Sequence, residues 1–300
     1  MSTDYPTAPG VETAEIFDRG YRRYDGERTG SIGAMRAVVG ASIQRALGLR
    51  RKFRFKVVPI LSAFIAYVPA MAFLGFAVLV PNELLADAGS GQEYGGYFGL
   101  IGMSLVLFSA FVAPELMSTD RETGLLGLYL AGPLSRLQYL VAKAVSLLTV
   151  MLIVSLFPIV FLLIGYTLLG LGPDGFGALM SLVGKIVLVG TITALYYTLI
   201  GMAVASLTKR KGFASAGIVV LLLASVALTG ILVEQGDAPN WVLLFGLLRL
   251  PADIAMRVFD EPLDQIADVS SFQAFGVFAG ICVVAAIVCG VAYRRLEVAK

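Results

Sequence analysis

The sequence contains no histidine, and its two cysteines, Cys282 and Cys289, lie in one apolar run. The missing histidines exclude His-ligated zinc sites, Ser-His-Asp triads and HExxH helices. On a helix, the two cysteines would lie about 10 Å apart, which is too far for a disulfide between them. The chain also lacks the GxxxxGK[ST] pattern, so it has no phosphate-binding loop of that kind.

Charge is scarce as well. Charged residues make up 15% of the chain and hydrophobic residues 58%, whereas soluble proteins average about 25% and about 45–50%. Six long runs contain a single charge, Lys185, and none alternates like a barrel strand. Because a bilayer is crossed by about 20 helical residues, we predict an all-α membrane protein whose transmembrane domain fills residues 57–293. Its six helices are predicted at residues 57–80, 97–114, 144–169, 179–207, 213–233 and 271–293.

The lysines and arginines between these runs predict their orientation. The segment before Val57 holds eleven, and the segments 115–143, 208–212 and 294–300 hold three each. Basic loops stay in the cytoplasm, so both termini and the loop 115–143 are predicted to be cytoplasmic. The other connections hold few basic residues and alternate with the basic ones; they are 81–96, 170–178 and the predicted outer loop 234–270.

The N-terminal segment divides into two parts. Residues 1–30 are polar and lack the apolar core of a signal peptide, so we predict a mobile cytoplasmic tail. Residues 31–56 are predicted to form an amphipathic helix in the membrane interface, with a basic end on anionic headgroups. The alternative is a basic flank that only sets topology. The apolar stripe consists of Ile32, Met35, Val39, Ile43 and Leu47.

A further apolar stretch, Trp241–Pro251, is too short to cross a bilayer. It continues into a charged segment that ends near Phe259, and together they fit an interfacial or re-entrant helix. A seventh span through residues 241–260 would carry Arg249, Asp253, Arg257 and Asp260 into the membrane, and we reject it on that cost.

Acidic residues are absent from every predicted span. Ion-coupled carriers usually place carboxylates inside the bundle, and hydrolases need paired carboxylates or other catalytic groups. We therefore predict no catalytic residue, no metal site and no cofactor site on this chain. Lys185 lies near the outer end of its span, and we expect its amine to reach the interface by snorkelling.

The segment from Pro114 to Lys143 is the most informative part of the chain. Thr119 and Glu122 form a T-x-x-E capping box, which predicts a helix beginning at Asp120. This helix would be rich in leucine and would end at Gly132-Pro133. An apolar helix that faces the cytoplasm needs a protein partner.

The same segment resembles the signature of ABC type-2 permeases, the membrane subunits of ATP-binding-cassette exporters. The matching residues are Arg121, Glu122, Thr123, Gly124, Leu126, Pro133, Leu134, Ser135, Arg136 and Lys143. Residues 31–56 are similar to the elbow helix of that family, and Trp241–Phe259 to its short outer helices between spans five and six. The resemblance implies a coupling helix that docks on a separate ATPase subunit through Asp120, Arg121, Glu122, Thr123, Gly124, Leu125, Leu126, Leu128, Tyr129 and Pro133.

The resemblance further implies an exporter of the bacterial plasma membrane that pairs with a second permease, either an identical copy or a homologue. ATP and Mg²⁺ would bind to the ATPase, and the chain would contact membrane lipid but no nucleic acid. The alternatives are an ion-coupled secondary carrier or channel, and a membrane anchor or assembly subunit that moves no substrate. Five polar residues of the predicted spans are candidates for the substrate path. The alternative is that their side chains only form hydrogen bonds between neighbouring helices. They are Tyr166, Thr193, Tyr196, Tyr197 and Thr198.

Overall fold

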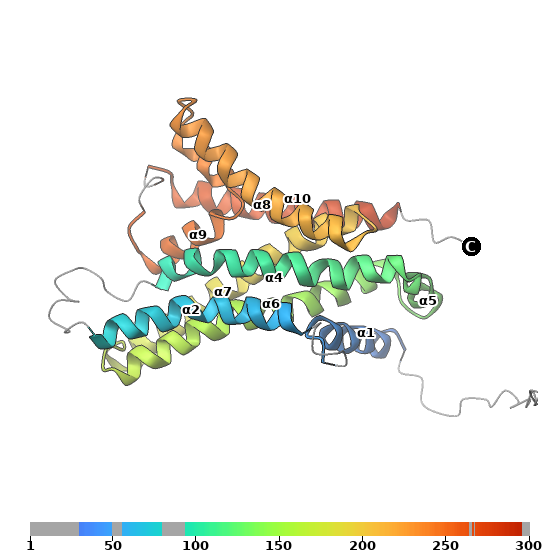
Figure 1. The fold of residues 1–300 in the computed structure, drawn as a ribbon, viewed down its shortest axis with the longest axis horizontal. Helices are drawn as coiled ribbons and strands as arrows, with labels where there is room; N and C mark the ends of the chain where they lie inside the picture. The colour runs from blue at the N-terminus through green and yellow to red at the C-terminus, as the bar shows by residue number, and fades with distance from the viewer. Residues whose placement is uncertain (1–29, 50–55, 80–93, 264–265, 267, 296–300) are drawn as a thin grey trace, which may run out of the picture.

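The computed structural model describes residues 30–49, 56–79, 94–263, 266 and 268–295. The predicted N-terminal tail, residues 1–30, therefore lies outside the described residues except for Gly30. Throughout the described ranges the regular structure is helical. The ten helices of these described residues include six that are long and apolar enough to cross a membrane. This confirms the prediction of an all-α membrane protein with six spans, of which α2, α4 and α6 run along the length of the bundle in Figure 1.

The six spans follow the predicted order but differ in length. Two of them, α4 and α6, extend well past the predicted residues 97–114 and 144–169. At 1.5 Å per residue, helices of 29 and 33 residues are about 44 and 50 Å long, more than the roughly 30 Å hydrocarbon core. Both are therefore longer than the hydrocarbon core requires. The spans are α2 (Val57–Leu79), α4 (Tyr94–Glu122), α6 (Arg136–Leu168), α7 (Gly175–Leu207), α8 (Lys211–Glu234) and α10 (Ser271–Arg294).

Helix α4 is the centre of the bundle and the most buried of the six spans. It packs against α2, α6, α7 and α8. Close approach to α7 depends on Gly201, where an added Cβ would lie 2.5 Å from the Ser109 Oγ and 2.9 Å from the Ala113 Cβ. Small residues at such contacts let helix backbones approach in a bilayer, where dispersion replaces the hydrophobic effect. By contrast, α8 and α10 are mostly exposed, and α8 leans away from the bundle at one end (Figure 1).

The bundle has two chemically different ends. At the α9 end, a 3₁₀ helix η2 (Asn240–Phe245) precedes α9 (Leu250–Phe259), which packs on the first turns of α4. The close contact occurs at Gly95, where an added Cβ would lie 2.8 Å from the Met256 Cα. The segment Trp241–Phe259 thus forms short helices, and the described residues contain no seventh span.

Charged groups fix α9 and the residues that follow it to the rest of the bundle. The Glu261 carboxylate accepts hydrogen bonds from the Gly95 and Gly96 amides at 2.6 and 2.8 Å, where the α4 dipole favours an anion. Lys185 of α7 is paired with Asp260 at 2.7 Å. The lysine thus finds a carboxylate at the α9 end, in keeping with an amine that reaches toward the end of its span.

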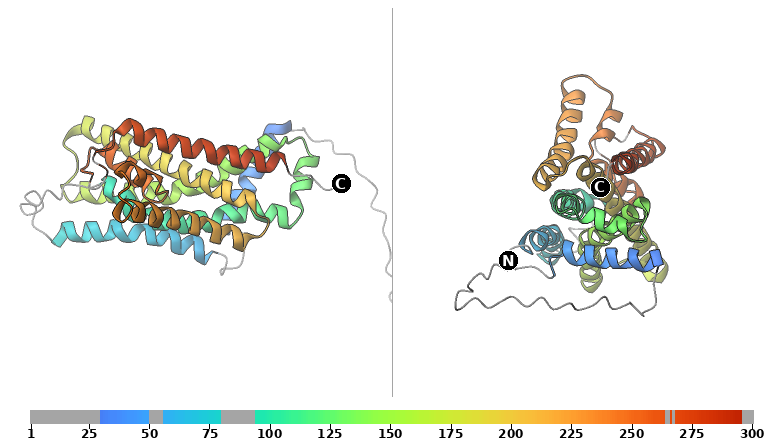
Figure 2. Two further views of the ribbon diagram at one scale, coloured as in Figure 1. Left: turned by 90° about the horizontal axis from the view of Figure 1, so that it is seen from above. Right: turned by 90° about the vertical axis from the view of Figure 1, so that its right-hand side faces the viewer.

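At the opposite end, called the α5 end, helix α1 (Gly30–Ala46) lies across the bundle (Figure 2). It packs mainly on α6. The sequence assigned its apolar stripe to lipid, but Val39, Ile43 and Leu47 of that stripe pack on the protein core, whereas Ile32 is exposed. The described helix ends at Ala46, before the predicted end at residue 56, and Gly48 follows with a φ of +65°. Its position in the membrane interface remains a prediction.

Candidate coupling site at the α5 end

The T-x-x-E pattern at Thr119 does not begin a helix. Helix α4 continues without a break through Asp120 to Glu122, and the Thr123 hydroxyl donates to the Thr119 carbonyl oxygen at 2.7 Å, as inside a helix. The break comes at Gly124, whose φ of +72° is left-handed. The predicted start at Asp120 is therefore wrong, because the capping residue lies within an apolar helix that is already formed. The short helix α5 begins instead at Leu125 and ends at Ala131.

Asp120 lies in the interior and is fully buried. Its carboxylate is 2.6 Å from the Lys143 Nζ, accepts a hydrogen bond from the Tyr139 hydroxyl at 2.8 Å, and forms an ion pair with Arg45. The Lys143 Nζ also donates to the Ser42 hydroxyl at 3.0 Å. In this way Asp120 connects α4 to α1 and α6. The predicted docking role of Asp120 needs correction in one respect: as placed, this carboxylate is not part of the surface.

Burial alone would destabilise this charged group of side chains. Desolvation of the Arg45 guanidinium lowers its pKa, but the Asp120 carboxylate and Tyr129 together outweigh that effect, and the pKa is raised above its usual value. Removing one partner of a buried ion pair is costly because it leaves the other charge unpaired and desolvated. The three charges are therefore stable together and unstable apart.

Arg121 points to the other side of α4. Its Nη1 donates to the carbonyl oxygens of Ser206 at 2.6 Å and Thr208 at 3.3 Å, at the last turn of α7. Its guanidinium also lies over the Tyr293 ring, 5.1 Å from the centroid, which connects it to α10. Carbonyl oxygens left free at a helix C-terminus favour a cation at this position.

Glu122 and Glu115 both bind Lys211, the first residue of α8. Glu122 accepts a hydrogen bond from the Lys211 backbone amide at 3.0 Å, and Glu115 pairs with the Lys211 Nζ. A carboxylate at the first amide of a helix complements its dipole. Three consecutive residues at the end of α4 thus contact α1, α6, α7, α8 and α10. We call Asp120, Arg121 and Glu122, with the groups that they bind, the charged junction.

Helix α5 follows the charged junction directly and lies at the extreme end of the bundle (Figure 1). Its two faces differ. Leu126 is buried, and Tyr129 packs on Tyr139 with ring centroids 5.8 Å apart, whereas Leu128 is 71% exposed. An exposed leucine on a short helix at the end of a bundle is a candidate contact for another protein. Glu122, Thr123, Gly124 and Pro133 are exposed as well, and Arg121 and Leu125 are half-buried.

A comparison with protein families identifies the chain. The family model described as "ABC-2 family transporter protein" matches residues 81–292, which is most of the sequence. The chain belongs to the ABC-2 transporter family. It is therefore a multi-pass membrane protein and the permease part of a transporter. None of the curated proteins in the comparison matches the chain.

The ABC-2 chain holds its predicted substrate-path residues inside one bundle. Tyr196 and Tyr197 donate from their hydroxyls to the carbonyl oxygens of Leu247 and Leu248, at 2.9 and 3.4 Å. These hydrogen bonds connect α7 to the segment between η2 and α9, which fits side chains that bond neighbouring elements. Tyr166, Thr193 and Thr198 are also buried, and the assignment of a path to any of the five remains a prediction.

Several residues in and beside the charged junction were not predicted as site residues: Arg45, Glu115, Tyr139, Lys211 and Tyr293. The one signal in the sequence was charge balance, because an acid and a base at buried helix ends must pair. As for metals, the described part of the ABC-2 chain contains no group of three or more His, Cys, Asp or Glu residues that fits an ion.

Proposed function

We propose that this chain is the membrane subunit of an ABC exporter, and that α5 docks on a separate ATPase subunit. The observation that supports this most directly is the connection of α5 to the bundle. Exposed Leu128 lies on a helix that starts just after Asp120, Arg121 and Glu122, whose side chains contact five other helices. A force applied to α5 would therefore act on α4 and on these five helices.

The direction of transmission follows from the contacts. Displacement of α5 moves the end of α4, because only Thr123 and Gly124 separate the two helices. Through Asp120 the displacement reaches α1 and α6, and through Arg121 and Glu122 it reaches α7, α8 and α10. Close-packed helices shift as rigid bodies rather than deform continuously. ATP and Mg²⁺ would bind to the partner and supply the energy, while the groups of this chain position and transmit.

Charge supports the proposed orientation. Arg45, Lys209, Arg210, Lys211 and Arg294 all lie at the α5 end, by their positions at the ends of α1, α7, α8 and α10. Basic residues are retained on the cytoplasmic side. We therefore place the α5 end, with both termini, in the cytoplasm of a bacterial cell, where an ATPase has access to ATP.

The proposal includes a second permease, either an identical copy or a homologue, with the substrate path between the two. Large apolar side chains of α2 and α8 are exposed in the single chain, among them Phe64, Phe76, Val220 and Leu228. Such faces contact lipid or another membrane subunit. Because a path between subunits uses side chains of this kind, we expect a hydrophobic or amphipathic cargo.

Site-specific photo-crosslinking tests the docking role. A photoreactive residue at Leu128 in native membranes should capture a chain that mass spectrometry identifies by its phosphate-binding loop. The matched control is Phe176, which is similarly exposed but lies at the start of α7, at the α9 end. Capture of no such chain from Leu128, or equal capture from both positions, would refute docking through α5.

A further inference from the structure

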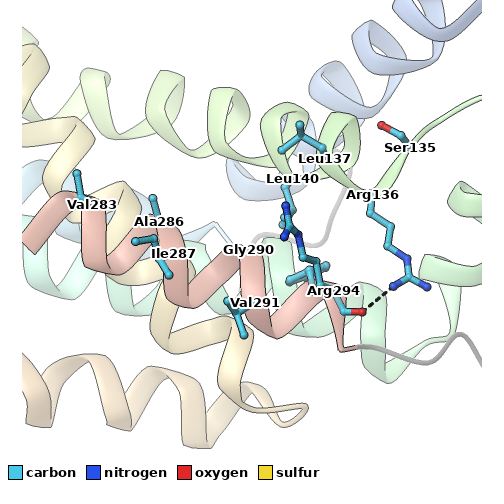
Figure 3. Close-up of a pocket in the computed structure, with 11 residues that line it drawn as sticks. Ser135, Arg136, Leu137, Leu140, Val283, Ala286, Ile287, Gly290, Val291 and Arg294 are labelled. Atoms are coloured by element: carbon cyan, nitrogen blue, oxygen red, sulfur yellow. Dashed lines mark hydrogen bonds between the residues drawn. The ribbon is translucent and has the colours of Figure 1, made fainter.

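A groove of about 680 Å³ lies between the beginning of α6 and the second half of α10 (Figure 3). Its walls are mostly apolar, with Leu137 and Leu140 from α6 and Ile287 and Val291 from α10. The space beside Gly290 is open, because a Cβ added there would meet no atom within 4 Å. Leu137 and Ile287 are exposed in the single chain, so the groove opens toward the surroundings of the bundle.

The α5 end of the groove is cationic. Arg136 and Arg294 line it there, and the Arg136 Nη1 donates to the Arg294 carbonyl oxygen at 2.9 Å (Figure 3). Both side chains are exposed, and neither forms an ion pair with any described residue. The first turn of α6, capped by Ser135, adds the positive end of a helix dipole. These groups match a negatively charged ligand in place of an acidic side chain.

The length of the groove matches half a membrane. From Val283 to Arg294 along α10 the rise is about 16 Å at 1.5 Å per residue. One leaflet of the hydrocarbon core is about 15 Å thick. A ligand that fills this groove thus has a charged part at the membrane surface and an apolar part as long as one leaflet.

We propose that the groove between α6 and α10 binds one phospholipid with an anionic headgroup. The phosphate lies between Arg136 and Arg294, since guanidinium groups bind phosphate with paired hydrogen bonds. One acyl chain packs along Leu140, Ile287 and the open face of Gly290. This lipid site is independent of ATPase docking, and neither proposal depends on the other.

The site is close to the charged junction. Tyr293 lines the groove and also lies under the Arg121 guanidinium and against the Tyr139 ring. A bound lipid is therefore one side chain away from the residues that connect the helices at the α5 end. Its occupancy restrains the last turn of α10, so the lipid composition of the membrane becomes an input to that connection.

Native mass spectrometry of the full chain tests the headgroup contact. The purified protein is mixed in turn with equal concentrations of phosphatidylglycerol and phosphatidylcholine of the same acyl chains. We expect one phosphatidylglycerol to be retained in preference, and the variant Arg136→Gln/Arg294→Gln to bind it roughly thirtyfold more weakly. The control Lys209→Gln/Arg210→Gln removes the same charge from exposed positions at the same end and should bind like the parent protein.

A second pair of variants tests the acyl contact without disturbing the fold. Gly290→Leu fills the groove, whereas Gly276→Leu on the same helix is equally free of clashes but lies outside it. Of these two variants, Gly290→Leu should lose the lipid and Gly276→Leu should retain it. Equal retention by all variants, or equal binding of phosphatidylcholine by the parent protein, would overturn the proposal.

The competing occupant is a second copy of the chain. A photoreactive residue at Ile287, which is 57% exposed, distinguishes the two in membranes. Adducts with the mass of a phospholipid support the proposal. Crosslinked dimers without lipid adducts would overturn it and assign the groove to an interface between copies.

Discussion

Asp120 is a fully buried carboxylate that Lys143, Arg45 and Tyr139 share. The substitution Asp120→Asn should destabilise the protein by about 3–5 kcal/mol, because it leaves the buried Lys143 ammonium without its anion. The melting temperature in detergent measures this effect. The double variant Asp120→Asn/Lys143→Met should recover a large part of the loss.

The matched control for Asp120 is Asp237→Asn. Asp237 is exposed and has a φ of +50°, which asparagine tolerates as well as aspartate. A melting temperature that falls equally in both variants, or a double variant no better than Asp120→Asn alone, would contradict a buried ion pair at the end of α4.

Asp253 and Arg257 form the corresponding buried pair at the α9 end, 2.9 Å apart. Burial raises the pKa of the Asp253 carboxyl, and the hydrogen bond from Arg257 only partly opposes that rise. A raised pKa means that the folded state binds its proton more tightly than the unfolded chain. Stability should therefore fall as pH rises from the unfolded value, about 3.9, through the folded one.

This gives a pH prediction. Relative to Asp253→Asn, the parent protein should gain melting temperature as the pH is lowered from about 7 toward about 4. Arg257→Met should steepen this dependence, because its loss leaves the Asp253 carboxylate unpaired and removes the group that opposes the rise of its pKa. Arg257 also donates to the carbonyl oxygens of Ile266 and Val269. Parallel curves for all three proteins would show that Asp253 does not titrate differently on folding.

Among the elements, α5 depends on one backbone conformation. Gly124 has a φ of +72° and open space where a Cβ would be, so a substitution there meets strain but no clash. Gly124→Val should cost about 1–2 kcal/mol locally, and hydrogen exchange of the α5 amides should quicken roughly tenfold.

Two control variants test whether the left-handed conformation of Gly124 causes the faster exchange. Gly124→Asn should have a smaller effect, because asparagine adopts left-handed conformations more readily. Gly177→Val, at an equally open glycine of α7 without positive φ, should leave α5 exchange unchanged. Equal exchange in Gly124→Val and the parent protein would mean that α5 does not need the left-handed turn.

The helices themselves were predictable from the sequence, and their ends were not. Long uncharged runs set the six spans because a bilayer penalises every charge within it. The same reasoning predicts that the second span ends at Pro114, before Glu115. The structure keeps Pro114 inside α4 and pairs Glu115 with Lys211, ninety-six residues later. A tertiary ion pair let the helix continue, and no local pattern reports such a partner.

In the candidate site, too, the sequence does not reveal which distant residues the predicted residues contact. The signature residues Arg121 and Glu122 were predicted as docking contacts from their resemblance to the family. The structure adds that they contact Ser206 and Lys211, and that neighbouring Asp120 is buried. Their partners are distant in sequence and come from helices whose packing fixes them. The short apolar helix that ends before Gly132-Pro133, by contrast, was predicted from the sequence, although it begins at Leu125 and not at the predicted Asp120.

At the scale of the whole molecule, the charged junction gathers the ends of the helices around α4. Helix α4 packs on α2, α6, α7 and α8. Its last residues also reach α10, on which α4 hardly packs otherwise, through the contact of Arg121 with Tyr293. The opposite end is closed by α9 and Glu261 on the first turn of α4. The central helix is thus fixed at both ends, which suits an element that carries motion along the bundle.

ATP hydrolysis by the permease assembled with the proposed ATPase subunit tests the role of the charged junction most directly. Arg121→Gln should still insert and assemble, but hydrolysis should fall on the order of tenfold, because Ser206, Thr208 and Tyr293 lose their link to α4. Arg210→Gln, an exposed arginine at the same end, should leave the rate unchanged. Hydrolysis in Arg121→Gln equal to that of the parent complex would contradict the claim that the charged junction couples α5 to the membrane helices.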